Sequence, residues 1–375
     1  SKDEPMAEDL EEIFLQLTLL SKDTPADNSL AQLGLTVDNN TITINSAADI
    51  ILLSNCASQE YQNLTVNMPV SGTLDITGTA SHNGVTYTFQ GFGSSDYPFA
   101  GTFSGSGVTL TINRTLFNGL SSTANLNGQN IEWKGTTSQP MLAEEYSFAD
   151  GEEHTFPIAV KIADDNTGAH NGYRAGNLID KIVKSPSNEG TAGTLLIRSA
   201  AVDYNSSNNS NAIEISNNEN AGLICNTLEA GTIKLNEFGY PSSFTVTAAN
   251  GSAGGLIGKM GNGTALEVTN TNSVTTSTTI TGLQNAGGIV GECDRAAVRL
   301  DNCSISSVLS STNGGAGGFI GTATDTTITS ANVTVDSLTA SGVNAGGFFG
   351  SYMQSSGGSF TPAAGITIPE QVTLS

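Results

Sequence analysis

Apolar positions recur with a period of about thirty residues through the second half of the chain. Counting from Leu223, the first apolar residue of each period falls at Leu256, Ile289, Phe319 and Phe348, in steps of 33, 33, 30 and 29 residues. A fixed period of this length is typical of architectures in which one unit stacks on the next. The pattern therefore predicts a repeat array over this part of the chain.

Within each period, apolar residues alternate with polar ones, which is the spacing of short strands with one buried face. One apolar pair falls about ten and twelve residues after the start of a period, and a further pair or single residue follows later. The sequence therefore predicts an all-β fold, a right-handed parallel β-helix (β-solenoid) with three short strands per coil. The residues expected to face inward are Ile233, Leu235, Phe244, Val246, Leu266, Val268, Ile280, Val298, Leu300, Ile305, Val308, Val333, Val335 and Leu338.

Four periods open with an Ala-Gly-Gly-apolar-apolar-Gly box, beginning at Ala253, Ala286, Ala316 and Ala345. Glycine allows a sharp turn at positive φ and a close approach of neighbouring backbones, because it has no Cβ. No box is a GxGxxG and none leads into a helical pattern, so a dinucleotide site is excluded. We interpret the box glycines as structural; they are Gly254, Gly255, Gly258, Gly287, Gly288, Gly291, Gly317, Gly318, Gly321, Gly346, Gly347 and Gly350.

The boxes resemble the GLUG repeat of bacterial secreted and surface proteins, over roughly residues 173–360. This resemblance implies an adhesin-like surface protein, without implying a particular ligand. The family also occurs beside zinc peptidase domains, but this chain has only 3 His and no HExxH motif, so no peptidase is expected.

The chain before the boxes divides into further segments. Residues 37–138 alternate like strands around a short helix expected at 47–55, and their order resembles the segment that commonly precedes such repeats, so we expect the first solenoid coils there. Asn118-Gly119-Leu120 stands where a full box is expected, which leaves the register open. We expect the acidic residues 139–172 to form a connector or a protruding loop, and residues 173–375 to form the GLUG-type coils.

Residues 1–36 are acidic, and apolar spacings of three and four predict an amphipathic helix from about Pro5 to Leu20. The end of a solenoid is an apolar surface that needs cover. We therefore expect this helix to cap the N-terminal coil, with a partner protein as the alternative. Ser1-Lys2-Asp3-Glu4 resembles the residues that follow the lipidated cysteine of surface-exposed lipoproteins in Gram-negative bacteria. That resemblance implies a lipid anchor in the outer membrane and a location at the cell surface.

Composition narrows the possible partners. A formal net charge of -22 disfavours nucleic acid, because phosphate backbones are bound by clustered Lys and Arg. No apolar run is long enough to span a bilayer, so contact with a membrane is expected only through the N-terminal anchor.

The four cysteines, Cys56, Cys225, Cys293 and Cys303, form no CxxC pair, so no zinc site is expected. Small buried apolar residues are the favoured interpretation. A disulfide between Cys293 and Cys303 is left open, because it depends on an oxidising compartment.

Candidate ligand contacts are the aromatic side chains that could form a platform for a sugar, namely Tyr87, Tyr97, Trp133 and Tyr204. Carboxylates in the repeats do not recur at a fixed offset beside a basic residue, so no catalytic residue, cofactor or metal ligand is predicted. A calcium site at Glu152-Glu153 and Asp164-Asp165-Asn166 is left open. Threonine runs at 275–279 and 326–329 lie at different offsets in their coils, so we interpret them as outward strand residues rather than an ice-binding array.

The sequence thus predicts a monomeric, non-catalytic surface protein whose solenoid presents loops to a host molecule, a glycan or a neighbouring cell. Two alternatives stay open. One is a polysaccharide-active lyase or hydrolase, which would need carboxylates converging in a lateral groove. The other is a purely structural envelope protein.

Overall fold

The computed structural model describes residues 28–162, 176–185, 192–198, 202–203, 213–238, 241, 243–362, 366–367 and 372–374, apart from the single residues 70, 106, 127 and 356. The amphipathic helix predicted from about Pro5 to Leu20 lies outside these residues. Among the described helices, none is long and apolar enough to cross a membrane.

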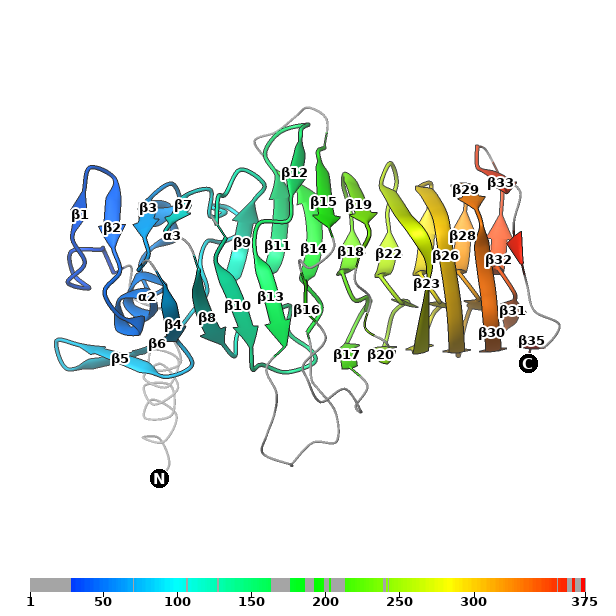
Figure 1. Cartoon of the computed structure of the whole chain (residues 1–375), viewed down its shortest axis with the longest axis horizontal. Helices are drawn as coiled ribbons and strands as arrows, with labels where there is room; N and C mark the ends of the chain where they lie inside the picture. The colour runs from blue at the N-terminus through cyan, green and yellow to red at the C-terminus, as the bar shows by residue number, and fades with distance from the viewer. Residues whose placement is uncertain are drawn as a thin grey trace, which may run out of the picture.

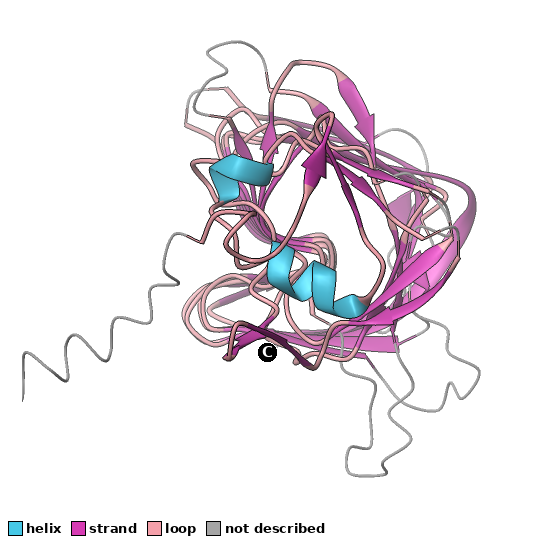
Figure 2. Cartoon of the chain, turned by 90° about the vertical axis from the view of Figure 1, so that its left-hand side faces the viewer, coloured by secondary structure: helices cyan, strands magenta, loops and turns pink. Residues whose placement is uncertain are grey.

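The chain winds into a β-solenoid of about 8 turns, with the N-terminal coils at one end and the C-terminal coils at the other (Figure 1). Described strands pair in parallel, except that β1 pairs with β2, and β5 with β6, in the antiparallel sense. The predicted all-β parallel solenoid is therefore confirmed. Figure 2 looks along the stack from its N-terminal side and shows strands surrounding the solenoid axis.

Five parallel or mixed sheets and one hairpin run along the stack. The first holds β1 (Val37–Asp38), β2 (Thr41–Thr43), β3 (Thr65–Asn67) and β7 (Thr102–Ser104). The second holds β4 (Gly72–Asp75), β8 (Val108–Ile112), β10 (Asn130–Trp133), β13 (Ala159–Ile162) and β16 (Val202–Asp203). The hairpin is β5 (Thr79–His82) and β6 (Val85–Thr88).

The two largest sheets form the sides of the C-terminal coils. The 8-stranded sheet contains β9 (Phe117–Ser121), β11 (Ala143–Phe148), β14 (Ile179–Lys184), β18 (Cys225–Leu228), β22 (Ile257–Met260), β25 (Val290–Asp294), β28 (Ile320–Thr324) and β32 (Phe349–Met353). The 12-stranded sheet contains β12 (Glu153–Thr155), β15 (Thr194–Arg198), β17 (Ile213–Asn217), β19 (Thr232–Asn236), β20 (Ser243–Ala248), β23 (Ala265–Gly282), β26 (Ala297–Ser311), β29 (Thr327–Ala331), β30 (Val333–Ser341), β33 (Ser359–Pro362), β34 (Ile366–Thr367) and β35 (Val372–Leu374). A last sheet of short strands holds β21 (Ala253–Gly254), β24 (Ala286–Gly287), β27 (Gly315–Gly317) and β31 (Asn344–Gly346).

The first apolar residue of each box packs inside the solenoid. Leu256 and Phe319 are 1% and 0% exposed, and the rings of Phe319 and Phe348 lie 4.8 Å apart between centroids. Stacked side chains of this kind repeat the same burial in every coil, which is how a solenoid builds its core. The apolar column predicted from the period is therefore confirmed.

The inward positions predicted from alternation are buried with one exception. Val308 is 51% exposed, whereas its neighbour Leu309 is 1% exposed. On β26 the inward residues continue in steps of two through Ile305, Ser307 and Leu309, so Val308 must face solvent. The prediction for Val308 was wrong because a serine, Ser307, occupies an inward position.

In two of the coils, two of the three predicted strands are fused into one long strand. These long strands are β23 and β26. In the next coil the two strands are separate, as β29 and β30, and divide at Asn332, which has a φ of 52°. Asparagine tolerates this left-handed conformation better than most residues. The Asn332 amide donates to the side-chain oxygen of Asn302, at 3.1 Å, which links the two corners.

The box glycines are required for close approach, and not for positive φ as we had also expected. All are described, and none has a left-handed φ. A Cβ on Gly258 would lie 2.6 Å from the Ala221 nitrogen, and one on Gly291 would lie 2.6 Å from the Gly258 oxygen. Backbone therefore occupies the space that a side chain would need.

Helix α2 (Ala47–Leu53) confirms the short helix predicted at 47–55. The Ser46 amide donates to the Asp49 carboxylate at 3.0 Å, which satisfies a free donor at the start of the helix. Its residues Ile50 to Leu53 are buried, and the helix packs against the β5–β6 hairpin. A second short helix, α3 (Ser58–Tyr61), follows.

Part of the segment predicted as a connector is an ordinary coil. Residues 143–162 contribute β11, β12 and β13 to the sheets, and Tyr146 and Phe148 are buried. On β11, two of the acidic residues that suggested a loop, Glu144 and Glu145, lie on outward positions, while Ala143 and Tyr146 on either side face the core. Residues 163–172 lie outside the described part of the chain.

Candidate functional site

The four aromatic residues predicted as ligand contacts have different environments. Tyr97 is 44% exposed, and Tyr87 is partly buried on β6, where it packs against the core. Trp133 is 1% exposed, and Tyr204 lies outside the described residues. Tyr97 is therefore the best exposed of the three that the structure places.

Trp133 does not serve as a surface platform, which corrects the prediction. It follows Ile131 by two residues on β10, and both face inward. An enclosed ring cannot stack on a ligand that approaches from solvent. Strand alternation alone could have shown this, because Ile131 and Trp133 share one face.

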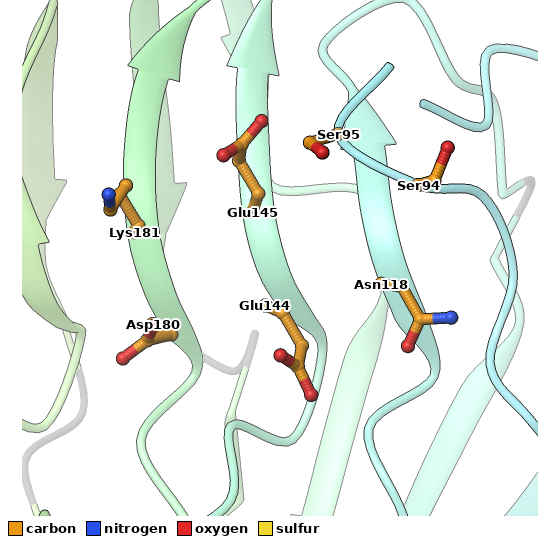
Figure 3. A pocket seen from close by; sticks show the side chains of 7 residues that line it. All are labelled: Ser94, Ser95, Asn118, Glu144, Glu145, Asp180 and Lys181. Carbon is orange, nitrogen blue, oxygen red and sulfur yellow. The ribbon is translucent and has the colours of Figure 1, made fainter. Parts of the chain in front are cut away.

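A surface pocket lies on the outward side of the 8-stranded sheet (Figure 3). Its volume is about 360 Å³. The lining residues are Ser94, Ser95, Asn118, Glu144, Glu145, Asp180 and Lys181. They come from the turn after residue 93 and from three successive coils, through β9, β11 and β14.

The turn that carries Tyr97 is held by two hydrogen bonds. The Tyr97 amide donates to the Ser94 hydroxyl, and the Ser94 amide donates to the Tyr97 carbonyl, both at 3.0 Å. Ser94 lines the pocket, so this turn joins the backbone of Tyr97 to a lining residue. The side chain of Tyr97 itself is not among the lining residues.

The strands expose two consecutive residues at the pocket. On β11, Glu144 and Glu145 both face outward between the inward Ala143 and Tyr146. On β14 the corresponding outward residues are Asp180 and Lys181. A regular strand would send one of each pair inward. The local bend in these strands therefore doubles the number of polar side chains at the pocket.

One position of this sheet changes its residue type along the stack. The parallel register aligns the last glycine of each box with polar residues in earlier coils. The aligned series is Asn118, Glu144, Asp180, Asn226, Gly258, Gly291, Gly321 and Gly350. The pocket thus lies where the box glycine is replaced by a side chain.

The box coils differ in what covers this position. There the alanine of the preceding box lies over it, as the Ala253 oxygen does at 2.7 Å from a Cβ built on Gly291. In the described part of the chain, no strand of the sheet that begins with β21 lies over β9, β11 or β14. Side chains fit there, and the uncovered surface forms the pocket.

Two of the pocket carboxylates, Glu144 and Glu145, have raised pKa values, which disfavours their charged forms. Partial burial raises the pKa of Glu144 above its usual value, and the nearby Asp180 raises it further, while Arg114 opposes the shift. Burial also raises the pKa of Glu145, against the effect of Lys181. Both pKa shifts follow chiefly from burial, and the neighbouring acids add to them.

Lys181 is shared among the acids. Its Nζ lies 3.2 Å from a carboxylate oxygen of Glu229 in the next coil, and both side chains are nearly half exposed. Figure 3 shows the carboxyl groups of Glu144 and Glu145 directed away from each other along the strand. The arrangement therefore offers two separate acidic positions along β11 for hydroxyl or cationic groups of a ligand.

The described residues contain no candidate site for a metal ion. Within them, no group of three His, Cys, Asp or Glu side chains is placed to hold a metal ion. Glu153 forms an ion pair with Lys234 at 3.1 Å, and residues 164–166 lie outside the described part.

The four cysteines are buried free thiols. Cys293 lies on β25 of the 8-stranded sheet and Cys303 on β26 of the 12-stranded sheet, and they form no disulfide. Burial raises the pKa of Cys303 to about 12 and raises that of Cys293 as well. Their thiols are therefore poor nucleophiles in the folded protein.

The fold places the chain in the structural class of parallel β-solenoids. No protein-family model matches the chain, and no significant match was found among curated proteins or solved structures.

Proposed function

We propose that this protein is a non-catalytic, adhesin-like binding protein of the bacterial cell surface, related to GLUG-repeat proteins. The observation that carries the proposal is the stack of about 8 turns, whose strands turn many polar side chains outward. A surface of this kind is suited to an extended partner, as in other solenoid proteins. The pocket adds a defined recess on one of these sheets.

The charge of the protein limits its partners. A formal net charge of -22 repels polyanions, so nucleic acid is not among the proposed partners. The partner is a protein or a glycan at the cell surface, bound by a monomer without a cofactor. The acidic start of the chain supports a lipid anchor in the outer membrane. Radiolabelled palmitate incorporated by the full-length precursor in a Gram-negative host would support the anchor, and its absence would refute it.

The function is tested by direct binding. Fluorescently labelled protein is applied to a glycan array, to immobilised host-matrix proteins and to whole cells, with heat-denatured protein as the control. We expect saturable binding to at least one of these surfaces. Binding that stays at the level of the control on all three would refute the proposed function.

The pocket also favours a second candidate, cleavage of a polysaccharide. Glu144, Glu145 and Asp180 line one recess together with Lys181, and sugar-cleaving enzymes commonly use paired carboxylates. The test is release of reducing ends or of unsaturated sugars from neutral and acidic polysaccharides. Turnover that is lost in both Glu144→Gln and Glu145→Gln, but kept in Glu132→Gln on the neighbouring sheet, would establish the enzyme. Absence of turnover would exclude it for those substrates.

A further inference from the structure

A second candidate surface lies on the 12-stranded sheet, away from the pocket. The strands β20, β23, β26 and β30 run side by side there at the lower right of Figure 1. Their parallel register aligns Thr245 with Thr279 and Val308, and aligns Val308 in turn with Thr339. The side chains therefore form rows along the solenoid axis.

The exposed rows consist of hydroxyl residues. Besides Val308, the described outward residues of this face are Ser243, Thr245, Thr247, Thr279, Thr281, Ser306, Ser310, Ser337, Thr339 and Ser341. Two threonine runs noted in the sequence do lie at different places, since 275–279 pairs with 304–308 and 327–329 pairs with 297–299. The in-register rows were missed because they combine Thr279 with residues outside either run.

Charged residues lie only at the borders of this face. Glu214 pairs with Thr245 at one border, and Asp336 precedes Ser337 at another, where it accepts a hydrogen bond from Ser304 at 2.7 Å. The other half of the same sheet instead carries charges at its outward positions, such as Lys234, Glu267 and Arg299. The absence of charge within the described rows is thus specific to this face of an acidic protein.

Some of these hydroxyls are available to a ligand, although those of Ser306 and Ser337 bond to each other. Those of Thr279 and Thr281 make no hydrogen bond to another side chain or to backbone in the described part of the chain. A hydroxyl both donates and accepts, so a row of them matches a partner whose groups also do both. Removing a hydroxyl from water also costs far less than removing a charge.

From these observations we propose that this face binds a neutral polysaccharide chain lying along the rows. Successive strands are about 4.7–4.9 Å apart, a length on the order of one pyranose unit, so sugar hydroxyls and serine or threonine hydroxyls can meet once per coil. Val308 supplies an apolar contact for the face of a sugar ring at the centre of the rows. The inference rests on the proposed surface-binding function and specifies its partner class.

The test uses the purified chain and a panel of neutral polysaccharides: cellulose, chitin, β-1,3-glucan, mannan and xylan. Co-sedimentation measures binding to the insoluble members, and affinity electrophoresis measures binding to the soluble ones. We expect retention by at least one member. Thr279→Glu should weaken it about tenfold, because a carboxylate would lose its water on binding.

Thr329→Glu is the matched control, since Thr329 is an exposed strand residue on the charged half of the same sheet. It should bind like the unmodified chain, and both variants should melt at similar temperatures. Equal binding by both variants would overturn the proposal. Retention by none of the polysaccharides would overturn it too. If the protein then inhibited ice recrystallisation through the same face, the ligand of that face would be ordered water.

The outcome separates this inference from the proposed function. If Thr279→Glu abolishes polysaccharide retention but cells are still bound through the pocket, the inference and the proposed function are both correct. They then use different sites. If polysaccharide retention is absent while cells or matrix proteins are bound, only the inference fails. If nothing is bound at all, the proposed function fails with it.

Discussion

The side-chain amide of Asn226 donates a hydrogen bond to the carboxylate of Asp180 at 2.7 Å, and its oxygen accepts one from the Gly222 amide at 3.2 Å. Asn226 is 3% exposed, whereas Asp180 lines the pocket. This contact joins the last open coil to the first coil in which the aligned position is covered. It therefore marks the boundary between the pocket and the glycine boxes.

Asn226→Ala should destabilise the protein by about 1–3 kcal/mol, because the Gly222 amide would be left buried without an acceptor. Urea unfolding monitored by circular dichroism measures the change. Asn250→Ala is the matched control: its amide bonds the exposed Asn218 at 2.9 Å, so its loss should cost little. Equal losses for the two variants would contradict the role assigned to Asn226.

Gly321→Ala should destabilise the fold by about 2 kcal/mol or more, because overpacking forces backbone to shift. A Cβ at this position would lie 2.5 Å from the Gly291 oxygen. Gly78→Ala is the control, since a Cβ there meets nothing within 4 Å and its φ is not left-handed. Thermal melting of both variants checks the prediction. A Gly321→Ala variant as stable as Gly78→Ala would show that the boxes tolerate side chains.

Leu309→Ala should cost about 2–5 kcal/mol, as expected for truncating a buried leucine. Val308→Ala, one residue away, should change the stability by less than about 0.5 kcal/mol, because its side chain is already half exposed. Chemical denaturation of the pair tests the inward register of β26. A larger loss for Val308→Ala would mean that the strand is rotated by one residue.

Glu144→Gln should stabilise the protein more at pH 7 than at pH 4. The pKa of Glu144 is raised by burial and by Asp180, so folding favours its protonated form, and stability falls as the pH rises above 4.5, the ordinary value for a glutamate. Glutamine removes this loss. Unfolding free energies at the two pH values measure the difference.

Asp75→Asn provides a control of opposite sign. Hydrogen bonds from the Thr77 hydroxyl and amide lower the pKa of Asp75, so its contribution is present at neutral pH and is lost on acidification. This variant should therefore be less stable at pH 7 and should differ least from the unmodified protein in acid. If both variants shift in the same direction with pH, the assigned electrostatics are wrong.

The period and the alternation were sufficient to predict the solenoid because they are repeated. Leu256 and Phe319 recur at nearly equal steps, and a residue that recurs once per turn must stack on its equivalent. Non-repeated features were harder to predict. Acidic residues such as Glu144 suggested a loop, although the same residues stand on the outward positions of a strand whose apolar neighbours are buried.

The candidate site was predictable only in part. Tyr97 was identified as an exposed aromatic residue, but nothing in the sequence indicated that Ser94 of the same turn would line one pocket with Glu145. From the sequence, residues 175–180 look like a degraded box that ends in Asp180, and aligning 139–144 in the same way would have placed Glu144 at the last box glycine. Whether another segment covers these two residues was decided only by the packing of the coils.

By itself the sequence determined that the chain is a stack of β-coils with an apolar interior, because local alternation and a fixed period suffice to specify both. Only the tertiary structure decided which polar residues become neighbours. Residues such as Asn118 and Asp180, or Thr279 and Thr339, are far apart in the chain, and they lie near each other because parallel pairing aligns equivalent positions of successive coils. The pocket and the hydroxyl rows both arise from that register, which depends on how the coils pack rather than on any local segment.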